Sequence, residues 1–315
     1  MTSTASNNYG ALRAQLDTLT TEAFRPELAE IDQLPTEEIA RLMNGEDATV
    51  PTAVAARLPQ IAAAIDAIAA RMSRGGRLVY AGAGTAGRMG VLDASECPPT
   101  FNTDPSEVLG LIAGGPSAMV TAVEGAEDSK KLAADDLDAL RLTADDTVVG
   151  ISASGRTPYA IGAVEHARGL GALTVGLSCN ADSALGSAAE HGIEVVVGPE
   201  LLTGSTRLKA GTAQKLVLNM LSTITMIRLG KTYGNLMVDV RASNEKLRAR
   251  SRRIVELATG ADDAEIEAAL TAAEGEVKTA ILIILGTVDA HTAVRLLDES
   301  RGHLRAALRA TTRTS

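Results

Sequence analysis

Five short apolar runs separated by helical segments constrain this fold more than any other feature of the sequence. The runs span residues 78–81, 108–112, 148–151, 173–177 and 193–197. Each is rich in β-branched residues and almost continuous, as expected of strands that are buried on both faces. Residues 128–140 and 158–168, which lie between runs, have the apolar spacing of helices. The alternation predicts an α/β fold built on a doubly wound, five-stranded parallel sheet.

Longer helical patterns lie on both sides of these runs. In residues 51–72 and 206–230 apolar side chains recur every three or four positions, which predicts two long amphipathic helices. Toward the C-terminus, short helical segments separated by glycines dominate. We therefore expect three parts, which are an N-terminal helical segment (1–50), a domain that holds the sheet (51–242) and a small helical domain (243–315).

Composition disfavours several classes of function. The chain has a formal net charge of −9, no tryptophan and only two phenylalanines, so we expect no nucleic-acid partner. No apolar run reaches the roughly 18 residues of a membrane span, and the N-terminus lacks the pattern of a signal peptide. We therefore expect a cytoplasmic protein without a membrane partner. The histidines and cysteines show no metal-ligand spacing, so no metal is expected.

A glycine-rich loop, Gly82-Ala-Gly-Thr-Ala-Gly-Arg88, follows the first run. Its glycines have the spacing of a dinucleotide fingerprint, which also requires an acidic residue at the end of the second strand. That strand ends here in Ile112-Ala-Gly-Gly115, which disfavours a dinucleotide. The loop instead predicts an anion site, with Gly84 and Thr85 as phosphate ligands.

A second polar loop, Ser152-Ala-Ser-Gly-Arg-Thr157, directly follows the third run and precedes Pro158, a favourable first helical residue. Hydroxyls and free N–H groups at a helix start favour a phosphate dianion. The same residues would also suit an ordinary helix cap. Both loops lie at the carboxyl edge of the sheet, where ligands bind in such folds. The predicted phosphate ligands in this loop are Ser152, Ser154, Gly155 and Thr157.

Carboxylates near the two loops are candidates for an acid and a base. Glu96 lies beside Pro98-Pro99, and Glu124 and Glu127 follow the second strand three residues apart, so those two could share a helical face. Two carboxylates near one anion could acquire separated pKa values and act as acid and base. Taken one at a time, each is more often a solvated carboxylate at a helix end. Lys209 could reach a phosphate or remain solvated.

Four longer strings resemble sugar-isomerase (SIS) domains and, among these, the N-acetylmuramic acid 6-phosphate etherases. The strings are residues 82–101, 123–128, 150–159 and 202–212. The resemblance implies a SIS-type fold, a homodimer and no cofactor. It also implies a phosphorylated amino sugar as substrate, with the D-lactyl ether of N-acetylmuramic acid 6-phosphate cleaved by elimination and hydration. The products would be N-acetylglucosamine 6-phosphate and D-lactate, in cell-wall sugar recycling.

The same resemblance gives Glu96 the role of acid and Glu127 the role of base. We expect a partly apolar pocket to hold Glu96 protonated. The sequence departs from the family at two places. The family usually has a serine where this chain has Ala86. It tends to have Thr-Glu-x-Arg-Asn near the N-terminus, where this chain has Thr21-Glu-Ala-Phe-Arg25, so no N-terminal residue is carried over to the site.

Two other functions remain open on this fold. A regulator such as the glucokinase regulatory protein binds phosphosugars without turnover and could dispense with either carboxylate, whereas this chain keeps both. An aldose–ketose phosphate isomerase would need a base but not the string Glu96-Cys-Pro-Pro99. Release of D-lactate would support the etherase, sugar interconversion the isomerase, and binding alone the regulator.

Overall fold

The structure, a computed structural model, describes residues 16, 18–240 and 245–314. The chain divides into two compact units, the first comprising residues 1–94 and 108–221 and the second residues 95–107 and 222–315. The predicted domain boundary at 242–243 lies outside the described residues. Two of the boundaries of this division fall within helices, at 94/95 in α5 (Gly84–Phe101) and at 221/222 in α9 (Lys209–Arg228).

The first unit holds a five-stranded parallel sheet, which confirms the predicted fold class. Its strands are β1 (Leu78–Gly82), β2 (Val108–Ile112), β3 (Thr147–Ile151), β4 (Leu173–Ser178) and β5 (His191–Glu194). They lie in the order β2-β1-β3-β4-β5, and every pairing is parallel. The order reverses between β1 and β3, so the carboxyl ends of these two strands form the switch point at which doubly wound folds bind ligands.

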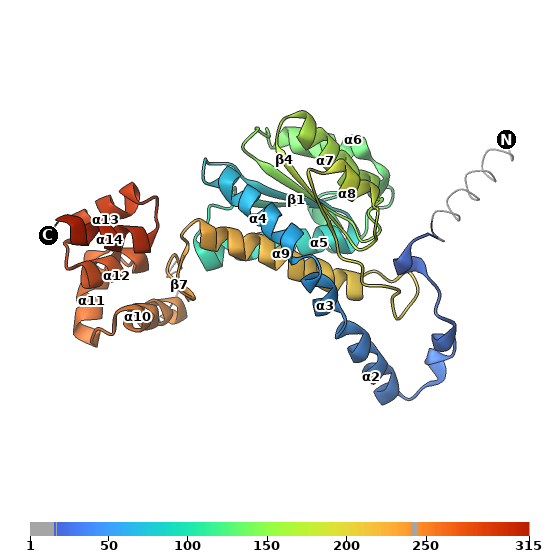
Figure 1. Ribbon diagram of the computed structural model, residues 1–315, viewed down its shortest axis with the longest axis horizontal. Helices are drawn as coiled ribbons and strands as arrows, with labels where there is room; N and C mark the ends of the chain where they lie inside the picture. Colours follow the sequence, from blue (N-terminus) through green and yellow to red (C-terminus); the bar gives the residue numbers. More distant parts are fainter. Residues whose placement is uncertain (1–15, 17, 241–244, 315) are drawn as a thin grey trace. The chain divides into compact units, whose positions relative to one another are not determined.

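Helices cover both faces of this sheet (Figure 1). On one face α6 (Lys130–Ala139) and α7 (Pro158–Gly169) pack against side chains that include Val79 and Val148. On the other face α5 lies so close to β1 that a Cβ atom on Gly90 would come within 2.9 Å of the Tyr80 Cβ atom. The second turn of α5 is therefore held tightly against the strand that precedes the helix.

Two predicted elements differ from the observed ones. The helix expected over residues 51–72 is broken into α3 (Val50–Ala55) and α4 (Leu58–Met72), because Pro59 lacks an N–H and its ring clashes with the carbonyl group four residues earlier. The fifth strand was expected at 193–197 and lies at 191–194. The neighbouring strand β4 ends at Ser178, whose carbonyl accepts from the Val195 N–H at 2.9 Å. Residues 196 and 197 therefore have no β4 residue to pair with.

The remaining elements of the first unit are short helices. The N-terminal part contains the 3-10 turns η1 (Thr20–Glu22), η2 (Pro26–Leu28) and η3 (Ile31–Gln33), followed by α2 (Thr36–Asp47). The loop after β2 contains η4 (Pro116–Met119) and η5 (Ala126–Asp128), and α8 (Ala184–Ala188) lies between β4 and β5. Of these elements, η1 and η5 supply residues to the cavity described below.

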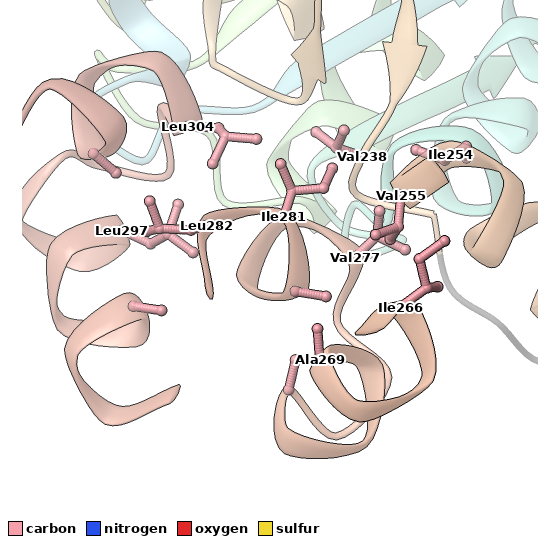
Figure 2. Close-up of a cluster of buried hydrophobic side chains, with 14 of the residues drawn as sticks. Val238, Ile254, Val255, Ile266, Ala269, Val277, Ile281, Leu282, Leu297 and Leu304 are labelled. Carbon is pink, nitrogen blue, oxygen red and sulfur yellow. The ribbon is translucent and has the colours of Figure 1, made fainter. Parts of the chain in front are cut away.

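The second unit is mostly helical. It contains the hairpin β6 (Thr232–Tyr233) and β7 (Leu236–Met237) and helices α10 (Glu245–Thr259), α11 (Asp263–Ala272), α12 (Val277–Gly286), α13 (Ala290–Glu299) and α14 (Leu304–Thr314). Figure 2 shows its core, in which Ile281 and Leu282 of α12 lie among apolar side chains of the other helices. In the part of the chain that the structure describes, no single helix is long and apolar enough to cross a membrane. Two pairs of consecutive helices, each pair sharply bent, have sufficient length and apolar character only when the two helices are taken together.

Candidate functional site

A cavity of about 500 Å³ opens at the carboxyl ends of β1 and β3. Its walls come from three N-terminal residues, the β1–α5 loop, the turn η5, the β3–α7 loop, Thr206 just before α9 and Gln214 within α9. Six of the residues proposed from the sequence line it. These are Gly84, Thr85, Glu127, Ser152, Ser154 and Thr157. Glu96, Gly155 and Lys209 do not.

In the β1–α5 loop the glycines serve two different purposes. Gly84 has φ +52°, a left-handed conformation that favours glycine, and it opens α5 beside the cavity. Gly87 serves packing, because a Cβ atom there would lie 2.6 Å from the Gly82 carbonyl oxygen and 2.7 Å from Ile112 Cγ1. The dinucleotide-like spacing is therefore explained by close contact between helix and sheet. The first N–H groups of α5 lack acceptors within the helix and are suited to an anion.

In the β3–α7 loop a buried serine organises the hydroxyl groups. The Ser152 hydroxyl lies 2.8 Å from the Thr157 hydroxyl and 3.2 Å from that of Ser154, and it accepts from the Gly155 N–H at 3.0 Å. Thr157 is the N-cap residue of α7, yet its side chain accepts no hydrogen bond from the helix. Thr157 therefore does not act as an ordinary cap. The Ser154 hydroxyl accepts from the Arg156 N–H at 3.2 Å, and all three hydroxyl residues line the cavity.

Gly155 shapes this loop without lining the cavity. Its φ is +69°, and a Cβ atom would come within 2.4 Å of the Ser183 Cβ atom. Only glycine therefore fits without displacing Ser183. Its predicted contact with phosphate stays a prediction.

The acidic residues after β2 are arranged differently from the prediction. Glu127 lies on η5 with an exposed side chain that lines the cavity together with Asp128. Glu124 lies in a turn before η5, so the expected common helical face is wrong. Gly125, in the left-handed conformation at φ 72°, separates the two glutamates, and η5 is only three residues long.

Glu96 lies on α5 in the second unit. Its side chain is exposed, so the expected partly apolar pocket is not formed around it by the single chain. One turn earlier, Asp93 is buried and accepts hydrogen bonds from the Tyr80 hydroxyl at 2.8 Å and from Asn219 Nδ2 at 2.6 Å. Asp93 thereby ties α5 to β1 and to α9, and this fixes the helix that carries Glu96.

Lys209 is buried in an ion pair and does not line the cavity. Its Nζ donates to Glu46 Oε2 at 2.6 Å, and Arg25 Nη1 donates to the other oxygen of Glu46 at 2.6 Å. Burial acts to raise the pKa of Glu46, but the hydrogen bonds from the two cations outweigh it and lower that pKa overall. The Lys209 charge is thus already balanced, and its predicted phosphate contact remains a prediction without support from this geometry.

The N-terminal segment adds Leu16, Leu19 and Glu22 to the cavity wall. It is held there by Asn180, which follows β4. Asn180 Nδ2 donates to the Thr21 hydroxyl at 3.1 Å, and Asn180 Oδ1 accepts from Thr20. This contribution was not predicted from the sequence.

Comparison with known proteins finds relatives that match nearly the whole of this chain. The N-acetylmuramic acid 6-phosphate etherase of Streptomyces avermitilis is 83% identical over 98% of this chain and 100% of its own. The relative of the same name from Mycolicibacterium smegmatis is 56% identical over 93% of this chain and 98% of its own. The relative of the same name from Escherichia coli O81 is 57% identical over 93% of this chain and 99% of its own.

This chain belongs to the N-acetylmuramic acid 6-phosphate etherase family. Two family models also match it, the glucokinase regulatory protein N-terminal SIS domain over residues 60–168 and the SIS domain over residues 126–224. Together these matches span the sheet from β1 to β5. The resemblance stated from the sequence is therefore confirmed.

Two wall residues that the sequence reasoning missed did leave a signal. Thr21-Glu22 matches the first two positions of the N-terminal string typical of the etherase family, and Glu22 lines the cavity. Gln214 on α9 is a polar residue on a face otherwise formed by buried Ala210, Val217 and Leu218. A buried polar residue is normally hydrogen-bonded within the protein, and one without a partner requires an explanation such as contact with a ligand. Among the described residues, no cluster of three or more His, Cys, Asp or Glu side chains is arranged to hold a metal ion.

Proposed function

We propose that this chain cleaves the D-lactyl ether of N-acetylmuramic acid 6-phosphate and yields N-acetylglucosamine 6-phosphate and D-lactate, in cell-wall sugar recycling. The observation that carries the proposal is the 83% identity, over nearly the whole of both chains, to a relative named for this etherase. The cavity adds support, because hydroxyls, helix starts and carboxylates line it at the switch point of the sheet. The proposed reaction uses no cofactor.

In this proposal the substrate phosphate binds where the two loops meet the cavity. The hydroxyls of Ser152, Ser154 and Thr157 donate to its oxygens. The starts of α5 and α7 add backbone N–H groups and favourable helix dipoles. The sugar then extends along the cavity toward Glu127, which lines the same space.

The proposed chemistry is an elimination followed by a hydration. In the open-chain sugar the aldehyde acidifies the proton on carbon 2. Glu127 removes this proton, the electron pair forms a double bond between carbons 2 and 3, and the bond from carbon 3 to the lactyl oxygen breaks. Glu96 gives a proton to that oxygen, so D-lactate leaves with an alcohol group. Water then adds its hydroxyl to carbon 3 while a proton returns to carbon 2.

The test is D-lactate release from N-acetylmuramic acid 6-phosphate, measured with a coupled D-lactate dehydrogenase assay. Glu127→Gln and Glu96→Gln should each lower turnover by about 10²–10⁴-fold, the usual contribution of a positioned proton-transfer group. Glu124→Gln is the matched control, because this nearby glutamate is exposed and does not line the cavity. Near-normal turnover in either of the first two variants would remove that residue from its role.

A non-catalytic phosphosugar-binding regulator is the second candidate. The match to the glucokinase regulatory protein domain over residues 60–168 favours it. Such a protein would bind N-acetylglucosamine 6-phosphate but release no D-lactate from the muramic acid substrate. The same assay therefore separates the two functions, and interconversion of aldose and ketose phosphates would reveal an isomerase.

We further propose that the protein acts in the cytoplasm as a homodimer. A sugar phosphate does not cross a membrane unaided, so an enzyme that consumes it belongs to the compartment where it is formed. A second copy of the chain could supply the apolar surroundings that the exposed Glu96 lacks in a single chain. Sedimentation of the purified protein as a dimer would support this state, and sedimentation as a monomer would contradict it.

A further inference from the structure

One polar side chain in the cavity wall has no role in the proposed proton transfers. Gln214 lines the cavity, and only 1% of its surface is exposed. Its Nε2 atom is buried without a hydrogen-bond partner, and its side chain forms no hydrogen bond with any described residue. Buried amide groups are nearly always hydrogen-bonded in folded proteins. An unsatisfied carboxamide at a cavity wall is therefore a candidate contact for a bound molecule.

The position of Gln214 on α9 turns it toward the first loop. Gly211 lies three residues earlier, and a Cβ atom there would lie 3.5 Å from Thr85 Cγ2. Residues three apart share one face of a helix, so Gln214 lies on the side of α9 that approaches the β1–α5 loop. Two apolar residues, Leu19 and Ala86, line the same cavity and are themselves buried. The carboxamide of Gln214 therefore shares the cavity with the apolar side chains of Leu19 and Ala86.

We propose that Gln214 recognises the 2-acetamido group of the sugar. A carboxamide offers one donor group and one acceptor, and the acetamido group offers the complementary N–H and carbonyl. The acetamido group is a trans amide, so its N–H and carbonyl point to opposite sides and cannot both pair with one carboxamide. The unsatisfied Nε2 of Gln214 can donate to the acetyl carbonyl oxygen, whereas a hydroxyl in place of the acetamido group lies closer to the sugar ring and offers no such carbonyl. The acetyl methyl group fits the apolar surroundings provided by Leu19 and Ala86.

This inference rests on the proposed function, because the acetamido group belongs to the proposed substrate. It also explains why an unsatisfied amide is kept in the free protein. Such a group lowers the stability of the empty protein, and binding sites often keep features that cost stability. Replacing Gln214 with an apolar residue of similar size should therefore leave the protein at least as stable while removing recognition of the amide.

The test compares two ligands by isothermal titration calorimetry. N-acetylglucosamine 6-phosphate carries the acetamido group, and glucose 6-phosphate has a hydroxyl in its place. Gln214→Leu should weaken binding of the first about tenfold or more and change binding of the second less than about twofold. The thermal midpoint of Gln214→Leu should equal or exceed that of the wild type. Equal losses for both ligands, an unchanged preference or a lowered midpoint would overturn the proposal.

Thr225→Val is the matched control on the same helix. The Thr225 hydroxyl is also buried without a partner, but this residue does not line the cavity. The variant should therefore keep the wild-type ligand preference. The binding comparison requires no turnover. Preference through Gln214 without D-lactate release would contradict only the etherase function, whereas D-lactate release with an unchanged preference in Gln214→Leu would contradict only this inference.

Discussion

The two edges of the parallel sheet differ in whether their polar side chains are hydrogen-bonded within the protein. At the amino edge, the buried carboxylate of Asp146 accepts hydrogen bonds from the Arg77 N–H, from the Arg77 guanidinium and from the Thr143 N–H, each at 2.8 Å. At the carboxyl edge, neither Glu127 nor Gln214 forms a side-chain hydrogen bond with a described residue. One edge satisfies its charges internally, and the other leaves polar groups open to a cavity.

The pKa of Asp146 is consistent with this difference. Burial acts to raise the pKa of its carboxyl group, but the hydrogen bonds from Arg77 and Thr143 outweigh burial and lower the pKa overall. The amino edge therefore contributes stability through groups that are ionised and fully paired at neutral pH. The unpaired Glu127 and Gln214 side chains at the carboxyl edge add no such stability and remain available for a ligand.

The largest expected effect lies at the amino edge. Asp146→Ala should destabilise the protein by about 3 kcal/mol, because it leaves the partly buried Arg77 without its partner. Urea unfolding measures this change in the free energy of unfolding. The affinity of the folded protein for N-acetylglucosamine 6-phosphate should stay the same. Asp145→Ala is the control, since its ion pair with Arg74 is exposed and should cost less than about 1 kcal/mol. Equal losses in both variants would mean that the amino edge does not stabilise the sheet in this way.

An intermediate effect is expected from the hydroxyl loop at the carboxyl edge. Ser152→Ala removes the group that contacts Thr157, Ser154 and the Gly155 N–H. It should weaken binding of N-acetylglucosamine 6-phosphate about tenfold and lower the free energy of unfolding by about 1–2 kcal/mol. Calorimetric titration and urea unfolding measure the two changes separately.

Ser178→Ala is a matched control for that loop. Ser178 is a buried serine at the end of β4, bonded to the Asn180 carbonyl and to Ser183, and it does not line the cavity. It should cost similar stability without changing the affinity. Unchanged binding in Ser152→Ala would remove the hydroxyl loop from the phosphate site.

The smallest effect is expected in the glycine loop, where Ala86 stands in place of the serine usual in the family. Ala86 lines the cavity and is 7% exposed, so Ala86→Ser places one hydroxyl at the wall. One added hydrogen bond of about 0.5 kcal/mol would strengthen phosphosugar binding by about twofold. Weaker binding would show that the site of this chain is adapted to the missing hydroxyl.

Features set by local sequence could be predicted. The buried runs around Val79 and Val148 and the loops that follow them depend on nearby residues, and the sheet order places both loops at one edge. The break before α4 was also local, because Pro59 interrupts a helix whose apolar spacing continues across it. The spacing pattern alone therefore overestimated the length of that helix.

Features set by distant residues could not be predicted. Glu22 lines the cavity because Asn180 holds the neighbouring Thr21 from 159 positions away. Lys209 forms an ion pair with Glu46, 163 positions earlier, and does not line the cavity. The carboxamide of Gln214 became a candidate contact only when the fold showed that it has no partner. Pairings of this kind depend on the assembled fold and leave little trace in local patterns.

The central claim is that the cavity at the carboxyl edge binds the phosphosugar. A crystal structure with N-acetylglucosamine 6-phosphate tests it most directly. The account predicts phosphate oxygens about 3 Å from the hydroxyls of Ser152, Ser154 and Thr157, with the sugar extending toward Glu127. A phosphosugar bound elsewhere, with these hydroxyls free of contact, would contradict the account.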